Sequence, residues 1–336
     1  MRPADVTSLR NWPVKCPVLL VIFRRPETTK LVFEAVRSAR PPILFVAADG
    51  PRNRDDEEPC QAARRITEEV DWPCDVYRDY SPTNLGCGPR PSSAISWTLG
   101  QVDRTIILED DCVPSLSFFR FCDALLERFR DDTRVMSIDG GNYLGDGRRL
   151  PYSYAFSRLF CPWGWATWRR SWAHFDRTMS GWAEAKSQRL LADIARSEFE
   201  VRDWTRFMDK YEHTEAHVWD FQWLLSCMLQ SGLTVFPDRN LVTNLGGGPS
   251  ATHTNVLASP LLSAPACDMD EIRHPAFVVR DCQADAYLYD HVFGGKHRRS
   301  HASLLGKGVL AARAVLQPRW AVSRIRSHLA RPGAAI

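Results

Sequence analysis

The sequence lacks the apolar segments that would place the chain in a membrane or send it across one. Its longest apolar runs, such as Pro17 to Phe23, fall far short of the roughly 20 residues that a transmembrane helix needs. Residues 1–16 are polar and contain no apolar core of a secretory signal. We therefore predict a cytoplasmic protein whose first 16 residues form an N-terminal tail.

Paired cysteines and the common nucleotide-loop signatures are missing as well. The ten cysteines are scattered without a C-x-x-C pair, which argues against a zinc site and favours buried thiols over a disulfide framework. Residues 84–88 (NLGCG) lack the third glycine of the dinucleotide fingerprint, and no Walker A loop is present. A dinucleotide-dependent dehydrogenase and a P-loop enzyme are therefore excluded.

A large excess of charge of one sign is also absent. The chain has 43 basic and 40 acidic residues, a net charge of +3, which gives no reason to expect nucleic acid as a partner. Basic residues dominate only after Gly294, where nine Lys or Arg occur without an acid. Segment 296–331 has two open interpretations: a helix pair packed on the protein, or a peripheral contact with anionic lipid at the inner face of the membrane.

Short apolar runs alternate with amphipathic ones in the first half of the chain. This pattern predicts strands at 17–23, 42–48, 74–80 and 105–108, and helices at 26–39, within 52–69, and at 92–101 and 115–130. Such alternation indicates an α/β fold, Rossmann-like, with a mostly parallel sheet and helices on both faces. Further on, we predict a helix at 219–231, with Gly232 as its C-cap, and a strand at 233–236.

Polar residues follow three of these strands, at the sheet edge where such folds bind ligands. They are Arg25, Asp49 and the triplet Glu109-Asp110-Asp111. Adjacent carboxylates repel each other unless a cation compensates, and Mn²⁺ or Mg²⁺ with a diphosphate would do so. The triplet alone does not decide between such a site and a solvated acidic turn.

The other polar candidates have two interpretations each. Asp49 either begins an ordinary turn or accepts a hydrogen bond from a uracil base, and Arg25 is either a surface charge or a clamp for base or phosphate. Asp220 is either a helix-start acid or a general base. Thr252 and His253, in the Gly-rich loop 244–254, are either plain loop residues or donors that close over a diphosphate.

Tryptophan is concentrated in one region of the chain. Eight of the twelve tryptophans lie between 163 and 223. Indole rings usually fill cores, but sugar faces also stack on aromatic rings. We therefore expect some of them, Trp165 and Trp219 in particular, to line an acceptor pocket.

Seven motifs, taken in order, carry a family resemblance over residues 17–255. They are PVLLVIFRRPE, ADGPR, NLGCGPRPSSAISW, IILEDDCVPS, WGWATWRRSW, WDFQW and NLVTN…THT. With them the chain resembles the bacterial GT-A-fold glycosyltransferase family A proteins of the nucleotide-diphospho-sugar transferase superfamily. It is more distantly similar to the Golgi N-acetylglucosaminyltransferase that begins complex N-glycans.

The resemblance implies a role for most of the candidate residues. It places Arg25 and Asp49 at the uracil, Asp110 at the ribose and Asp111 on the metal ion. It makes Asp220 the catalytic base and Thr252 a contact of the diphosphate. The family's DXD motif is Glu-Asp-Asp here, which leaves Glu109 without a role.

The resulting hypothesis is an inverting, metal-dependent glycosyltransferase. It would use a nucleotide-sugar donor, UDP-linked by the resemblance, and a glycan or lipid-linked glycan acceptor. Residues 17–140 would form the nucleotide-sugar half, 141–290 the acceptor half, and 291–336 a basic C-terminal tail. Two other classes stay open: a non-catalytic carbohydrate-binding or scaffold protein, and a metal-dependent phosphatase or pyrophosphatase.

Overall fold

The computed structural model describes residues 5–145, 148–212, 218–246 and 264–301. The chain divides into two units, Met1–Leu288 and Tyr289–Ile336, and each is described by itself. In the described part of the second unit, residues 295–301 are helical and Arg299 forms an ion pair with Asp290 at 2.5 Å. The rest of segment 296–331 lies outside the described residues, so both interpretations of it stay predictions.

Strands and helices alternate through the first half of unit 1, as the sequence pattern predicts. They are β2 (Val18–Ile22), α1 (Pro26–Ala39), β3 (Ile43–Ala48), α2 (Arg54–Ile66), β4 (Asp75–Tyr80), α3 (Pro89–Gln101), β5 (Arg104–Glu109), α4 (Leu116–Arg128) and β7 (Val135–Asp139). Helix α3 begins three residues earlier than predicted because Pro89 occupies its first turn, where a missing N–H costs nothing.

One eight-stranded sheet forms the centre of unit 1. Its order is β4-β3-β2-β5-β9-β7-β10-β8, with β8 (Tyr154–Ser157), β9 (Trp165–Trp168) and β10 (Leu233–Pro237) supplied by the second half of the chain. Strand β9 is antiparallel to both of its neighbours, and β8 is antiparallel to β10. The other six strands run in one direction, so their carboxyl ends share one edge.

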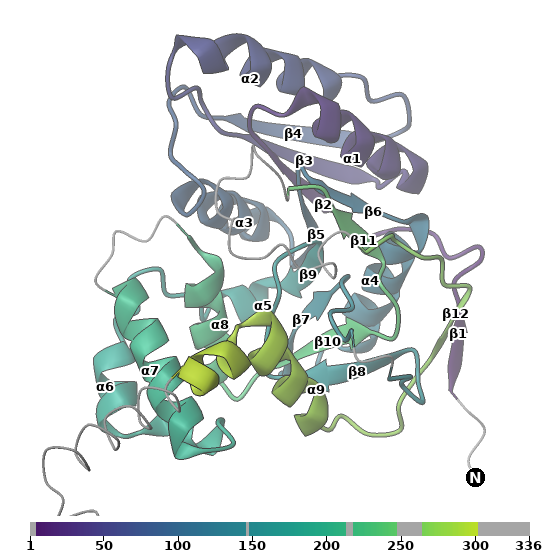
Figure 1. Ribbon diagram of the computed structural model, residues 1–336. Coiled ribbons are helices and arrows are strands. Elements are labelled where there is room, and N and C mark those ends of the chain that lie inside the picture. Colours follow the sequence, from purple (N-terminus) through teal and green to yellow (C-terminus); the bar gives the residue numbers. More distant parts are fainter. Residues whose placement is uncertain (1–4, 146–147, 213–217, 247–263, 302–336) are drawn as a thin grey trace, which may run out of the picture. The chain divides into compact units, whose positions relative to one another are not determined.

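Helices cover both faces of this sheet (Figure 1). Helices α1 and α4 contact each other and share an apolar core with alternate sheet residues such as Leu20. Helix α3 contacts β2, β3 and β5 and packs against α5 (Arg169–Trp172), on the face to which the buried Leu19 points. The predicted fold class, an α/β fold with a mostly parallel sheet and helices on both faces, is therefore confirmed.

The second half adds helices that the sequence pattern resolved only in part. They are α6 (Trp182–Ser187), the 3₁₀-helix η1 (Leu190–Asp193), α7 (Glu198–Glu212) and α8 (Asp220–Leu229). The predicted helix 219–231 is α8, but Gly232 is not its C-cap: the cap is Gln230, and Ser231 takes the left-handed conformation with φ 52°. Gly232 instead lies so close to Met136 that a Cβ would come within 2.2 Å of its sulfur.

Two small antiparallel pairs join distant parts of the chain. Strand β1 (Val6–Ser8), within the predicted N-terminal tail, pairs with β12 (Glu271–Arg273). Strand β6 (Cys112–Pro114) pairs with β11 (Val242–Asn244), and this second pair brings the segment after β11 next to the acidic triplet.

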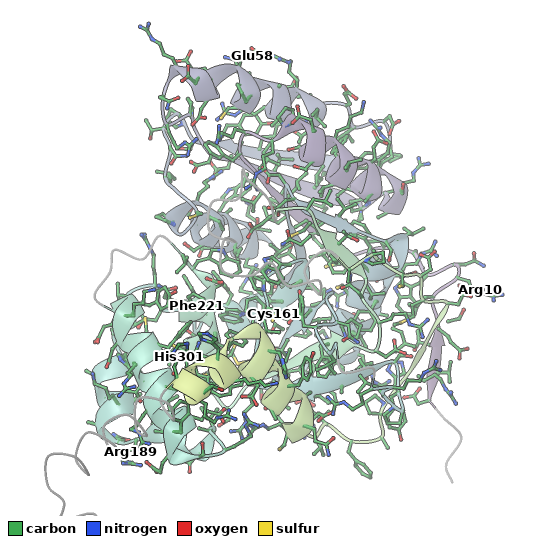
Figure 2. The ribbon with its side chains drawn as sticks, viewed as in Figure 1. Arg10, Glu58, Cys161, Arg189, Phe221 and His301 are labelled. Atoms are coloured by element: carbon green, nitrogen blue, oxygen red, sulfur yellow. The ribbon has the colours of Figure 1, made fainter. Side chains whose placement is uncertain are left out.

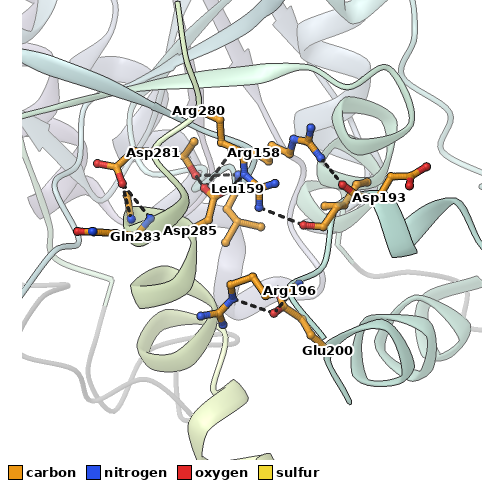
Figure 3. Close-up of polar contacts among 12 residues, drawn as sticks. Arg158, Leu159, Asp193, Arg196, Glu200, Arg280, Asp281, Gln283 and Asp285 are labelled. Atoms are coloured by element: carbon orange, nitrogen blue, oxygen red, sulfur yellow. Dashed lines mark hydrogen bonds and ion pairs between the residues drawn. The ribbon is translucent and has the colours of Figure 1, made fainter. Parts of the chain in front are cut away.

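A buried carboxylate ties α9 (Cys282–Tyr287) to the sheet. Asp285 is 3% exposed and accepts from the Ser157 hydroxyl at 2.5 Å, from the Arg158 backbone and from the Arg280 guanidinium (Figure 3). Arg158 also donates to the carbonyl of Asp193 in η1. Strand β8, helix α9 and η1 are therefore held by one polar network.

The structure also bears on the cysteine prediction. The ten cysteines all lie in the described ranges and form no disulfide there, and six of them are buried: 16, 60, 112, 122, 161 and 227. The preference for buried thiols over disulfides is thus confirmed. No helix in the described ranges is both long and apolar enough to span a bilayer.

Candidate functional site

The acidic triplet lies at the carboxyl end of β5, in the middle of the sheet edge. Glu109 is the last residue of β5, and Asp110 and Asp111 form the turn into β6. Asp110 is 5% exposed, whereas Glu109 and Asp111 keep partial exposure. The short turn between β5 and β6 prevents the three carboxyl groups from separating.

Arg25 and the end of β2 meet this triplet. Asp110 accepts from the backbone N–H of Phe23 at 2.9 Å and from Arg25 Nη1 at 3.1 Å. The same Nη1 donates to Asp111 Oδ2 at 2.7 Å. The structure thus brings together the polar ends of the two adjacent parallel strands β2 and β5.

Burial and mutual repulsion oppose the charge of the triplet. Burial, followed by the neighbouring Asp111 and Asp110 and then by Asp220, raises the pKa of Glu109 to about 8. Burial and Asp111 also raise the pKa of Asp110 to about 6, against the opposing effect of Arg25. An added cation would therefore stabilise the ionised form of these carboxylates.

The donor chemistry fits a hard divalent cation bound by few protein ligands. Asp111 offers carboxylate oxygens, and one of them is already paired with a cationic group, Arg25. No set of three or more His, Cys, Asp or Glu side chains arranged to hold a metal occurs among the described residues. A metal ion here would therefore depend on Asp111 and on oxygens that a ligand such as a diphosphate supplies.

Asp49, directly after β3, holds a loop in place. Its Oδ1 accepts from the backbone N–H groups of Gly50 at 2.9 Å and Leu85 at 2.8 Å. Its Oδ2 accepts from the Asn84 side chain and the Gly86 backbone, both at 3.0 Å. Four donors use the acceptor capacity of a carboxylate, so in this structure Asp49 positions residues 84–86. The predicted contact with a uracil base stays a prediction.

The loop held by Asp49 reaches the other acids of the site. Gly86 has φ +87°, a conformation that suits glycine, and Cys87 follows it. The pKa of the Cys87 thiol is raised, first by burial and then by Glu109, Asp220 and Asp49. The charges of all three carboxylates therefore act on Cys87, which the sequence pattern did not predict.

Asp220 is the first residue of α8, and its side chain is partly buried. Burial raises its pKa to about 6, opposed by the backbone N–H groups of Asp220 and Phe221. Its charge contributes to the raised pKa of Glu109 and, after burial and Asp139, to that of Cys161 (Phe221 and Cys161 are labelled in Figure 2). Asp220 and Glu109, distant in the sequence, are thus neighbours in the fold.

Trp165 and Trp219 belong to a buried aromatic cluster. Their rings stack with centroids 5.5 Å apart and planes 20° from parallel, and both side chains are less than 5% exposed. Trp172 packs against both rings, and Trp223 packs against Trp165 and Trp172. This packing is typical of a protein core. Trp219 also immediately precedes Asp220 in the chain, and the predicted role of the two rings in an acceptor pocket stays a prediction.

The chain passes directly beside Asp111 before it enters residues 247–263. Leu245 donates its N–H to the Asp111 carbonyl at 2.8 Å, and Gly246 donates to the Asn244 side chain at 2.7 Å. A Cβ on Gly246 would lie 2.2 Å from Asp111 Oδ2. Thr252 and His253 lie outside the described residues, so their roles stay predictions.

Replacing Gly246 with alanine is expected to displace the Asp111 carboxylate, because the added methyl group needs the space of Oδ2. Mn²⁺ affinity, measured by isothermal titration in the presence of UDP, should fall by about tenfold or more, equivalent to roughly 1.4 kcal/mol. Gly181→Ala is the matched control, because a Cβ there meets nothing within 4 Å. Equal affinities for Gly246→Ala and Gly181→Ala would mean that the close approach has no consequence for binding.

Comparisons with known proteins give weak likenesses only. Neither a family model nor a curated protein sequence matches the chain. Solved structures similar to it include a mannosyltransferase from Pyrobaculum calidifontis in complex with GDP-mannose and Mn²⁺, at 15% identity and TM-score 0.32, covering 50% of this chain and 48% of that one. This chain therefore spans about half the length of the mannosyltransferase.

Two nucleotidyltransferases are similar at the same level. The 4-diphosphocytidyl-2C-methyl-D-erythritol synthase of Anaerococcus prevotii has 10% identity and TM-score 0.30 over 64% of this chain and 98% of its own. A UDP-glucose pyrophosphorylase complexed with UDP-glucose has 7% identity and TM-score 0.32 over 68% and 94%. We draw no activity from likenesses this low and infer the function from the site itself.

Proposed function

We propose that this protein is an inverting glycosyltransferase that moves a sugar from a UDP-sugar to a hydroxyl of a glycan or lipid-linked glycan. The supporting observation is the convergence of four groups at one sheet edge: Arg25, the triplet 109–111, the loop held by Asp49, and Asp220. Parallel α/β sheets bind ligands at this edge. The cluster combines a carboxylate suited to a metal–diphosphate with a second acid of raised pKa nearby.

In this proposal the donor is held by the first half of the chain. Asp110 contacts the ribose, and Arg25 contacts the base. Asp49 acts on the base through the loop that it fixes. Asp111 would hold Mn²⁺ or Mg²⁺, and the ion would supply positive charge that stabilises a departing diphosphate. Thr252 and His253 donate to the diphosphate, and Trp165 and Trp219 support the acceptor.

Asp220 acts as the general base. Its carboxylate takes the proton of the acceptor hydroxyl while that oxygen bonds to the anomeric carbon and the bond from this carbon to the diphosphate oxygen breaks. One attack from the face opposite the leaving group inverts the anomeric configuration. The raised pKa of Asp220 supports this role, because a base with a pKa nearer neutrality accepts a proton more readily.

The pH dependence of transfer should report the ionisation of Asp220. Only the deprotonated carboxylate accepts a proton, so kcat/KM is expected to be flat above about pH 7 and to fall about tenfold per pH unit below a pKa near 6. Initial rates at saturating Mn²⁺ between pH 5 and 8 measure this profile. A rate that is constant from pH 7 down to pH 5 would contradict the assignment.

The experiment that tests the function as a class is UDP release. The full-length protein is incubated with Mn²⁺ and a panel of UDP-sugars, without acceptor and then with candidate glycan acceptors. A transferase releases UDP slowly by donor hydrolysis and faster with an acceptor, and the sugar appears on the acceptor. A phosphatase or pyrophosphatase would release phosphate or UMP instead, and a binding or scaffold protein would release nothing.

A further inference from the structure

The Arg25 guanidinium forms an ion pair with Asp111, the proposed metal ligand. Its Nη1 lies 2.7 Å from Asp111 Oδ2 and 3.1 Å from Asp110 Oδ1. Throughout the described ranges, no other basic side chain forms an ion pair with the triplet. An Asp111 oxygen that would bind a metal ion is therefore paired with Arg25.

The backbone of Arg25 is fixed, whereas its side chain can leave. The Arg25 carbonyl accepts from the Thr29 N–H at 2.9 Å and from the Thr29 hydroxyl at 2.7 Å, and Pro26 begins α1 immediately after it. The Arg25 side chain is 29% exposed, against 13% for Asp111 and 7% for Asp110. A long, partly exposed side chain on a fixed Cα can exchange one partner for another without movement of the helix.

We propose that Arg25 is a positioning residue that couples metal binding to nucleotide binding. Without a nucleotide its guanidinium stays on Asp111, and when UDP or a UDP-sugar binds, the guanidinium turns to the nucleotide and leaves Asp111 to the metal ion. This inference rests on the proposed function. It predicts that this acidic cluster holds a metal ion more tightly together with a nucleotide than alone.

Competition for one carboxylate oxygen has a measurable consequence. The apparent affinity of a ligand equals its intrinsic affinity multiplied by the fraction of protein that is competent to bind it. If Arg25 occupies Asp111 most of the time, Mn²⁺ alone binds weakly, and UDP strengthens Mn²⁺ binding by removing the competitor. By linkage, Mn²⁺ strengthens UDP binding by the same factor.

The test measures Mn²⁺ binding to the full-length protein, by isothermal titration or by the electron paramagnetic resonance of free Mn²⁺, with and without UDP. No sugar donor is present, so the result does not depend on turnover. We expect Arg25→Gln to bind Mn²⁺ alone about tenfold more tightly than the native protein. In the native protein we expect UDP to enhance Mn²⁺ binding by a factor within the roughly 5–150-fold range typical of coupled sites. In the variant this enhancement should be smaller.

Arg24→Gln is the matched control. It removes the same charge one residue away, but Arg24 pairs with Asp56 at 3.0 Å and not with the triplet. Its Mn²⁺ affinity and its enhancement by UDP should equal those of the native protein. If both variants tighten Mn²⁺ binding equally, general electrostatics is the cause and the proposal for Arg25 is wrong.

A second measurement keeps the test valid if Arg25→Gln does not fold. In the native protein the nitrogen-15 resonance of the Arg25 side chain, assigned with Arg25→Lys, should shift when UDP is added without metal. An unshifted resonance overturns the proposal.

The remaining outcomes separate this inference from the proposed function. If the native protein binds UDP with Mn²⁺ but Arg25→Gln shows no gain in Mn²⁺ affinity, only the role of Arg25 is wrong. If the native protein binds neither ligand, the proposed function fails and this inference fails with it.

Discussion

Replacing Asp220 with asparagine is expected to lower kcat by about 10²–10⁴-fold, the range typical of a lost general base. Asparagine has nearly the same shape and still accepts from the first backbone N–H groups of α8, so the fold and the donor KM should change little. The measurement is the steady-state rate of sugar transfer to the acceptor that the UDP-release experiment identifies. A thermal unfolding curve for each variant checks that it is folded.

Asp55→Asn is a matched control for this prediction. Asp55 is also an acid in the first turn of a helix, but it is exposed and lies on α2. It should leave kcat unchanged. If Asp220→Asn retains a native rate while folding normally, the proton is taken by another group, and Glu109 would be the first candidate because it lies next to Asp220.

Replacing Asp111 with asparagine is expected to have an effect of similar size through the metal ion. A bound metal contributes several kcal/mol to the stabilisation of transition-state charge, and about 3 kcal/mol corresponds to roughly 10²-fold in rate. The native protein should lose activity in EDTA and recover it with excess Mn²⁺, whereas Asp111→Asn should recover little at the same Mn²⁺ concentration.

Asp103→Asn serves as the control at the other end of the same strand. Asp103 is exposed, precedes β5 and forms an ion pair with Arg169 at 3.2 Å. It should keep native activity and native dependence on Mn²⁺. Transfer that continues at full rate in EDTA would exclude a metal ion from the mechanism, and the triplet would then need another explanation.

Much of the fold could be predicted from local patterns because the first half is built from local units. The apolar run before Arg24 and the proline at position 26 predict β2 and α1 almost to the residue. Parallel strands joined by helices then place Arg25, Asp49 and the triplet at one edge without further information. These residues could be found from sequence for that reason.

The remaining features depend on contacts between distant segments, which a local pattern does not encode. Strand β9 enters the sheet antiparallel between β5 and β7, although its sequence, Trp165–Trp168, looks like part of an aromatic cluster. Gly232 looks like the helix cap, but the cap is Gln230; Gly232 lies two residues further on, donates to the Cys227 carbonyl of α8 at 2.8 Å and packs closely against Met136. In both cases the local structure depends on a contact with a segment that is distant in the sequence.

The same limit applies inside the site. Asp49 resembles a free carboxylate in sequence, yet the fold surrounds it with four donors, three of them from residues 84–86. Asp220 raises the pKa of Glu109 by its charge although the two residues are far apart in the sequence, and no spacing in the sequence indicates this interaction. Gly246 becomes notable only once β11 pairs with β6 beside Asp111.

The central claim is that the edge formed by β2, β3 and β5 binds a nucleotide diphosphate together with a metal ion held by Asp111. Isothermal titration of UDP into the full-length protein, with and without Mn²⁺, tests this claim most directly when repeated with Asp111→Asn. We predict UDP binding that is strengthened by Mn²⁺ in the native protein and is insensitive to Mn²⁺ in the variant. UDP binding that is absent from the native protein, or equally strengthened by Mn²⁺ in both proteins, would contradict it.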